Sequence, residues 1–93
     1  MIHSFADKET AAVYAGLAPK RLPRNIIKRA KERLDQLHAA VSLKDLQVPP
    51  SNRLEALKGD RKGQWSIRVN DQWRVCIRWR GGEAFDVEIV DYH

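Results

Sequence analysis

The sequence predicts an α+β domain, with helices from its N-terminal half packed on a mostly antiparallel sheet from its C-terminal half. Two patterns support this prediction. Apolar residues recur at spacings of three and four between residues 23 and 41, as in an amphipathic helix. Between residues 64 and 90 they alternate with polar residues, as in strands with one buried face. A chain of 93 residues has room for one hydrophobic core, so residues 1–93 are expected to form a single domain.

The first half is expected to contain a short strand and two helices. Ile2 and Phe5 flank the candidate strand, and Asp7 is a plausible N-cap for a helix that ends before Gly16. Pro23 suits the first turn of a longer helix. The apolar stripe of this second helix consists of Ile26, Ala30, Leu34, Leu37 and Val41.

The second half is expected to form a meander of strands. Ser42 is a candidate cap for one helical turn, and residues 49–52 then interrupt regular structure. Strands are predicted over residues 53–57, 64–69, 73–79 and 84–90. Their core-facing side chains are predicted to be Trp65, Ile67, Val69, Trp73, Val75, Ile77, Trp79, Phe85, Val87 and Ile89. Cys76 is interpreted as a small sheet residue, because one cysteine cannot form an internal disulfide.

Strand register predicts that two arginines stand side by side. Odd positions share one face of an antiparallel pair only when paired residue numbers sum to an even value. Placing Val69 opposite Trp73 therefore pairs Arg68 with Arg74. Like charges directly opposite each other destabilise a sheet by a few tenths to about 1 kcal/mol, which a phosphate between them would relieve. The other interpretation is that both arginines splay into water and only Arg74 has a role.

The second hairpin is expected to be less regular. Placing Trp79 opposite Phe85 requires a longer or bulged loop around residues 81–82. The same register pairs Arg78 with Asp86, which has an ordinary structural explanation as an ion pair.

The charge of the chain favours an anionic partner. The formal net charge is +5 and the isoelectric point is about 9.7, which points to nucleic acid or another anionic surface. The excess is N-terminal, since residues 1–40 hold eight Lys or Arg against four acids, and residues 41–93 hold nine against eight. On the second helix, Arg24 and Lys28 are candidate RNA-binding residues. A solvated face with Lys28/Glu32 and Lys31/Asp35 pairs is an equally good interpretation.

Several classes of protein are disfavoured. No apolar run approaches the roughly 20 residues of a membrane span, and the first residues lack the plan of a signal peptide. We therefore expect a cytoplasmic protein without membrane contact. No Cys or His cluster has the spacing of a zinc site, so neither a metal nor a cofactor is expected.

Two further segments carry groups suited to phosphate chemistry. Lys58 begins a loop whose two glycines permit tight turns and leave backbone amides accessible to an anion. Asp91, Tyr92 and His93 follow the last strand directly and supply a carboxylate, a phenol and an imidazole for proton transfer and stacking. By position alone, however, a terminal histidine is more often a frayed end than a catalyst.

The stretch LEALKGDRKGQWSIRVNDQWRVCIRW and the ending EIVDYH resemble the HigB group of the RelE-like toxins of bacterial type II toxin–antitoxin systems. The opening MIHSF fits as well, so the resemblance covers nearly the whole chain. It implies the RelE-like fold, in which helices pack on a mostly antiparallel twisted sheet. It also implies a ribosome-dependent mRNA endonuclease that inhibits translation. In such toxins the 2′-hydroxyl attacks the adjacent phosphate without a metal and leaves a cyclic phosphate and a free 5′-hydroxyl.

The resemblance also implies roles for particular residues. Lys58 and Arg74 match the phosphate stabilisers. Arg68 is a further candidate RNA contact on the ground of strand register, not of the resemblance. The tail Asp91-Tyr92-His93 matches the active-site tail, in which His93 is the first candidate for proton transfer. Tyr92 is suited to stacking on a base, and Asp91 to fixing the histidine or moving a proton itself.

The sequence departs from some members of the group at Glu55, where a histidine can occupy the position before the LKGDR-like segment. Three roles are open to Glu55. It could be the general base, the partner of an arginine, or only a surface carboxylate.

The resemblance further implies three kinds of partner. These are a HigA-type helix-turn-helix antitoxin, the ribosome with its mRNA, and operator DNA reached only through the antitoxin. A non-catalytic RNA-binding module is the main alternative, because the same basic surface and aromatic residues would serve it. A DNA-binding regulator is disfavoured, since the apolar stripe of the basic helix is committed to the core.

Overall fold

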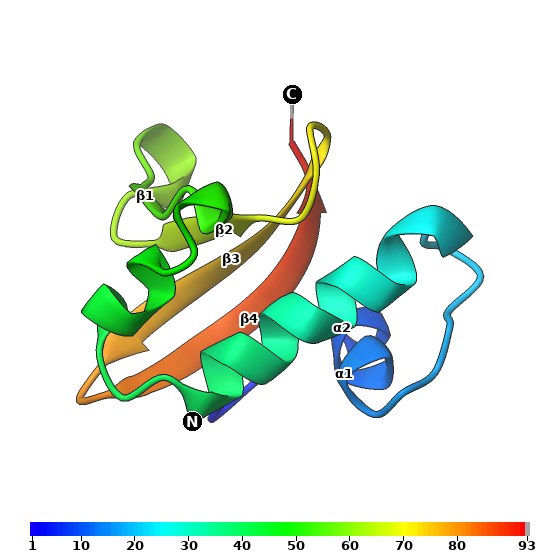
Figure 1. Cartoon of the computed structure of the whole chain (residues 1–93), viewed down its shortest axis with the longest axis horizontal. Helices are drawn as coiled ribbons and strands as arrows, with labels where there is room; N and C mark the ends of the chain where they lie inside the picture. The colour runs from blue at the N-terminus through cyan, green and yellow to red at the C-terminus, as the bar shows by residue number, and fades with distance from the viewer. Residues whose placement is uncertain (93) are drawn as a thin grey trace.

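The helices precede the sheet along the chain, and α2 crosses one face of it (Figure 1). The computed structural model describes residues 1–92. Helix α1 spans Lys8–Tyr14 and α2 spans Arg24–Ala39. The sheet has the order β1-β2-β3-β4, and each neighbouring pair is antiparallel. Its strands are β1 (Glu55–Ala56), β2 (Trp65–Arg68), β3 (Trp73–Arg80) and β4 (Glu83–Asp91). The predicted α+β architecture is confirmed.

Both predicted helices form, and their ends have local causes. The Asp7 carboxylate accepts a hydrogen bond from the Thr10 amide at 2.9 Å and so caps α1, as predicted. Helix α2 begins directly after Pro23 and ends at Ala39, where the backbone becomes extended. The prediction that Val41 belongs to the apolar stripe is therefore wrong, since its side chain is 78% exposed.

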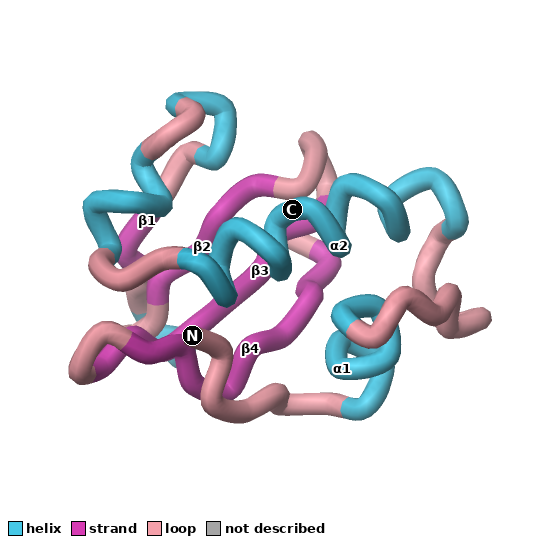
Figure 2. Tube along the Cα trace, turned by 60° about the horizontal axis from the view of Figure 1, so that its bottom comes forward, coloured by secondary structure: helices cyan, strands magenta, loops and turns pink. Residues whose placement is uncertain are grey.

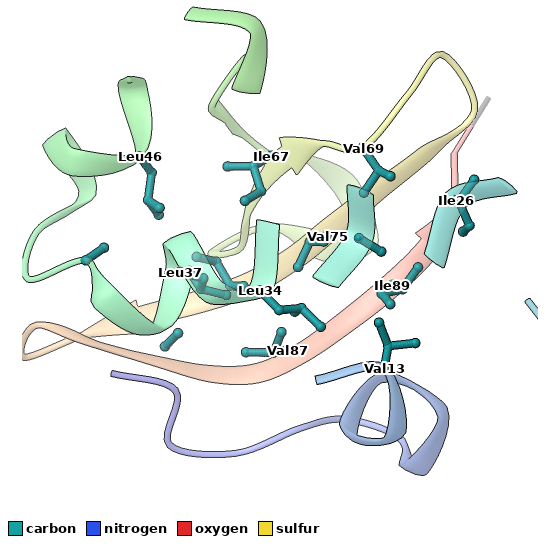
Figure 3. Close-up of a cluster of buried hydrophobic side chains, with 14 of the residues drawn as sticks. Val13, Ile26, Leu34, Leu37, Leu46, Ile67, Val69, Val75, Val87 and Ile89 are labelled. Carbon is teal, nitrogen blue, oxygen red and sulfur yellow. The ribbon is translucent and has the colours of Figure 1, made fainter. Parts of the chain in front are cut away.

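The hydrophobic core lies between α2 and the sheet, as Figure 3 shows. Leu34 and Leu37 of α2 are fully buried and belong to the same cluster as Val75 and Val87. The predicted alternation is confirmed along β2 and β3, where the odd positions are core residues. The three tryptophans at these positions pack against the core while only partly buried.

The register of the second hairpin differs from the prediction. Trp79 lies opposite Ala84 rather than Phe85, and residues 81–82 form a tight two-residue turn. The extra residue lies instead within β4, near Asp86, whose φ of 52° marks a β-bulge. Phe85 therefore does not face the core, and Ala84 takes that place. The Arg78–Asp86 ion pair still forms, with 3.5 Å between Nε and Oδ2.

Phe85 instead joins a surface cluster on the opposite face of the sheet. Its ring centroid lies 4.5 Å from that of His3, and the Arg80 guanidinium lies 4.8 Å from it. The prediction that Phe85 is a core residue is therefore wrong, because the bulge reverses the alternation of β4 at this point.

The predicted first strand is reduced to two isolated parallel bridges. Ile2 pairs with Ala84, and Phe5 pairs with Val87. Figure 2 shows this segment leading from the N-terminus past β4 into α1. Residues from the N-terminus of the chain thus also contact the sheet, along β4.

The segment between α2 and the sheet is built from short 3₁₀ helices. Helix η1 spans Leu43–Gln47 and is capped by Ser42, as predicted, with Asp45 completing the capping box. Helix η2 spans Pro50–Asn52 and ends at Arg53, which adopts the left-handed conformation. This turn delays the first strand, so β1 is shorter than the predicted 53–57.

Candidate functional site

Arg74 lies on the face of the sheet opposite α2 and is fixed there by several contacts. Its side chain is nearly buried, with 9% of its surface exposed. Nε donates to the Ser66 hydroxyl at 2.7 Å, and Nη2 donates to the Arg53 carbonyl oxygen at 2.5 Å. Nη1 lies 3.6 Å from the Glu55 carboxylate. The structure thus holds a cation in one orientation beside a carboxylate, which is a preorganised arrangement for an anionic ligand.

Arg68 stands directly opposite Arg74, so the predicted register of β2 and β3 is confirmed. Each arginine has its own acidic partner, because Arg68 pairs with Asp71 while Arg74 pairs with Glu55. The interpretation that both arginines splay into water is wrong for Arg74, whose guanidinium is held against the sheet.

Glu55, on β1, takes the second of its three possible roles in this structure, as the partner of Arg74. Its side chain is 51% exposed, so the carboxylate also remains accessible from solvent. The ion pair and the exposure together leave Glu55 able to contact both the cation and an incoming ligand.

The end of β4 and the residue that follows it reach the same region. The Arg74 guanidinium lies 5.7 Å from the centroid of the Tyr92 ring, within the range of a cation–π contact. Asp91 accepts hydrogen bonds from the Gln72 side-chain amide at 3.1 and 3.2 Å. His93, the first candidate for proton transfer, lies outside the described residues. The structure therefore places Glu55 and Tyr92 around one cation, Arg74.

Lys58 lies in the loop that follows β1, with its side chain exposed. The loop contains the 3₁₀ helix η3 (Gly59–Arg61), and the positive φ angles of Gly59 and Gly63 confirm the predicted turns. Arg61 ties this loop to the sheet through a 3.3 Å contact with Glu88. Lys58 is thus carried on a loop that is fixed next to β1.

Cys76 is fully buried on the same face as Arg74 and is a free thiol, as its interpretation as a small sheet residue requires. Burial raises the pKa of this thiol above its ordinary value. Because the thiolate is the reactive form, Cys76 is a structural residue rather than a nucleophile.

The basic face of α2 divides into two parts. Arg33 Nε donates to the Arg68 carbonyl oxygen at 2.8 Å, and Arg29 Nη1 donates to that of Val69 at 3.4 Å. Burial lowers the pKa of Arg33, and the neighbouring Arg29 lowers it further. These two arginines therefore tie α2 to the β2–β3 loop, a role that their sequence pattern did not predict.

The remaining cations of α2 face outward. Arg24 and Lys28 are exposed and lie on the helix rather than in the Arg74 cluster, while Lys31 pairs with Asp35 at 2.6 Å as predicted. A pocket of about 380 Å³ lies between α2 and the β2–β3 loop. Its lining consists of Asn25, Ile26, Lys28, Arg29, Glu32, Val69 and Asn70.

Three contributors to the site were missed by sequence reasoning. The contact with the Arg53 carbonyl could not be predicted, because every residue type has the same backbone acceptor. Ser66 is a small polar residue on the face of Arg74, and the confirmed register pairs it with Cys76, diagonally across from that arginine. Gln72 had no signal beyond its place in the turn.

No helix within residues 1–92 is long and apolar enough to cross a membrane. Within the same residues, no group of three or more His, Cys, Asp or Glu side chains could hold a metal ion.

The fold is that of RelE-like toxins. The toxin–antitoxin complex YoeB–YefM from Staphylococcus aureus contains a chain that superposes with a TM-score of 0.61. The match covers 100% of this chain and 98% of that chain. Because the sequence identity is 15%, the match shows a shared fold and nothing further.

Sequence comparison then identifies the family. The model of the family described as "RelE-like toxin of type II toxin-antitoxin system HigB" matches residues 3–93. Toxin HigB-1 of Vibrio cholerae serotype O1 is 39% identical over 87 residues, covering 92% of each chain. Endoribonuclease HigB of Proteus vulgaris is 31% identical over 93 residues, covering all of both chains. The chain therefore belongs to the HigB family of RelE-like toxins, which confirms the resemblance found in the sequence.

Proposed function

We propose that this toxin is a ribosome-dependent mRNA endonuclease that stops translation in the cytoplasm and needs no metal or cofactor. The observation that carries the proposal is the buried Arg74, fixed by Ser66 and Arg53 beside the accessible carboxylate of Glu55. The relative from Proteus vulgaris that bears the name endoribonuclease supports the same activity.

The proposed reaction uses the RNA's own 2′-hydroxyl as the nucleophile. The 2′-oxygen loses its proton to a base and forms a bond to the adjacent phosphorus. The bond from phosphorus to the 5′-oxygen breaks, and that oxygen takes a proton from an acid. The products are a 2′,3′-cyclic phosphate and a free 5′-hydroxyl. The protein must therefore supply a base, an acid and positive charge for the phosphate oxygens.

Each requirement has a candidate in the site. Arg74 and Lys58 stabilise the negative charge that develops on the phosphate. Glu55, 3.6 Å from Arg74 and half exposed, takes the proton of the 2′-hydroxyl. His93 is proposed as the group that protonates the leaving oxygen. Tyr92 stacks on a base, and Asp91 orients the tail.

Further cations are proposed to contact RNA beyond the cleavage site. Arg68, which is partly buried, lies opposite Arg74 on the neighbouring strand, and Arg24 and Lys28 are exposed on α2. Because each phosphate contact releases counterions, we expect ribosome binding to weaken steeply as salt is added.

The antitoxin partner is proposed to be of the HigA kind, with a helix-turn-helix that binds operator DNA. The toxin would then reach DNA only through this partner. Membership of a toxin–antitoxin family supports an antitoxin partner, and the matching fold of the YoeB–YefM complex comes from such a pair.

The decisive experiment is expression in bacteria without the antitoxin, followed by mapping of mRNA 5′ ends. Wild type is expected to arrest growth and produce new 5′ ends within translated regions. Arg74→Ala and His93→Ala are expected to abolish both effects, with folding checked by circular dichroism. Cleavage that survives both substitutions would overturn the assignment. A non-catalytic RNA-binding module would instead tolerate His93→Ala.

Glu55→Gln tests the proposed base separately. We expect cleavage on purified ribosomes to fall by about 10²-fold or more, the range of general base catalysis, while ribosome binding is retained. Glu83→Gln, at the first residue of β4, is the matched control because it removes the same charge. Undiminished cleavage by Glu55→Gln would exclude this role for Glu55.

A further inference from the structure

The tail that carries Asp91 and Tyr92 is held by one residue of the β2–β3 loop. The Gln72 side-chain amide donates to both oxygens of the Asp91 carboxylate, at 3.1 and 3.2 Å. The Gln72 carbonyl oxygen accepts a hydrogen bond from the Tyr92 amide at 2.6 Å. Gln72 therefore contacts two consecutive tail residues, Asp91 through its side chain and Tyr92 through its backbone.

The loop that presents Gln72 is itself fixed. The Asn70 side chain accepts hydrogen bonds from the backbone amides of Gln72 and Trp73, at 2.9 and 2.7 Å. At the start of the loop, Arg33 and Arg29 of α2 donate to the main-chain carbonyls of residues 68 and 69. Contacts therefore lead from α2 to the β2–β3 loop, and Gln72 connects that loop to the tail.

We propose that Gln72 is a positioning residue, which holds the tail so that Tyr92 stays over Arg74. The inference rests on the proposed function, because it assigns Gln72 to the same cleavage site. Tyr92 lies directly after β4, and the hydrogen bond from its amide to the Gln72 carbonyl extends the strand pairing by one residue. The Gln72 side chain adds a second constraint through its two hydrogen bonds to Asp91, and this is the constraint that a substitution of Gln72 removes.

The size of the effect follows from the demands of the reaction. A displacement of about 1 Å at a reacting group can cost about 10²-fold in rate. A hydrogen bond between exposed groups is weak in terms of stability, but it can still restrict the position of a short tail. Loss of Gln72 is therefore expected to affect the chemical step far more than the free energy of unfolding.

The test uses Gln72→Ala and Gln72→Glu, with Gln47→Ala and Gln47→Glu as matched controls on the exposed surface of η1. The single-turnover cleavage rate on programmed ribosomes is measured separately from ribosome affinity. We expect Gln72→Ala to reduce the rate about 10-fold with little change in affinity. Gln72→Glu should be slower still, because it places a carboxylate against that of Asp91. The Gln47 variants should match wild type.

The order of substitution effects distinguishes positioning from packing. If Gln72 only filled space, the isosteric Glu would be tolerated better than Ala. Wild-type rates for Gln72→Glu, or a faster rate for Glu than for Ala, would therefore overturn the proposal.

A second measurement separates this proposal from the proposed function. The mobility of the Tyr92 amide is followed by NMR relaxation in the free protein, without RNA. We expect greater mobility in both Gln72 variants, and unchanged mobility in both would overturn the positioning role. If wild type failed to cut RNA, the proposed function would fall, while the NMR result would still report whether Gln72 holds the tail.

Discussion

Both faces of the sheet contain buried side chains, but of different kinds. The face under α2 is filled by apolar side chains such as Val75 and Val87, which need only fit together. The opposite face buries Ser66 and Arg74, which need hydrogen-bond partners at defined positions. The first arrangement stabilises the fold, and the second keeps a cation in place. Substitutions on the two faces should therefore affect stability and activity in different proportions.

The largest effect on stability is expected from Leu34→Ala. Leu34 is fully buried between α2 and the sheet, and removing it leaves a cavity. We expect a loss of about 2–5 kcal/mol in the free energy of unfolding, measured by urea denaturation. Val41→Ala is the control, since this residue was predicted to belong to the same stripe but is exposed. An equal loss in both variants would contradict the observed end of α2.

Ser66→Ala should give a smaller loss of stability and a clear loss of activity. The substitution leaves Arg74 Nε without its buried acceptor, at a cost of about 1–3 kcal/mol. Because Arg74 is then less constrained, mRNA cleavage should fall even in protein that remains folded. Urea denaturation and the ribosome cleavage assay measure the two effects. Ser51→Ala, an exposed hydroxyl on η2, should change neither.

Cys76 predicts a pH dependence of stability. Burial raises the pKa of its thiol in the folded state, so the unfolded chain ionises first, from about pH 8.5. The unfolded state then binds fewer protons, and the free energy of unfolding falls as pH rises through this window. Urea denaturation of wild type and Cys76→Ala between pH 7 and 10 isolates this contribution. A constant difference between the two proteins would show that the thiol is not shielded.

The smallest effect on stability is expected from Asp71→Ala. Asp71 is almost fully exposed, so its ion pair with Arg68 should add nothing measurable to the unfolding midpoint. Ribosome affinity at low salt should increase slightly, because Arg68 is released and one negative charge is removed. Binding measured over a salt series checks this, with Glu83→Ala as a control for charge. Weaker binding would indicate that the ion pair holds Arg68 in a productive orientation.

Local patterns predicted most of the fold. The cap at Asp7, the stripe from Ile26 to Leu37, and the pairing of Arg68 with Arg74 all follow from spacing and period. The bulge at Asp86 did not, because a single residue with positive φ leaves no trace in an alternating pattern. One such residue was enough to exchange the predicted places of Ala84 and Phe85.

The candidate site was predictable where resemblance identified charged residues, as at Arg74 and Glu55. It was not predictable where a contact depends on main-chain atoms or on distant segments. The Arg53 carbonyl reaches Arg74 across 21 positions of sequence, and Arg33 reaches the Arg68 carbonyl across 35. Such contacts depend on how the elements are placed in space, which residue types and spacing do not specify.

The first residues of the chain also cover a sheet edge that could otherwise pair with another molecule of this protein. Backbone amides along the outer side of β4 donate hydrogen bonds to the N-terminal segment and α1. The amide of Ala84 donates to the Met1 carbonyl, those of residues 86 and 87 donate to Ser4, and that of Ile89 donates to the Thr10 hydroxyl. An open edge strand of this length is a template for aggregation through strand addition. The N-terminal segment and α1 cover that edge, and β1, at the other edge, has only two residues. The sheet is thereby protected at both edges against joining another copy of itself.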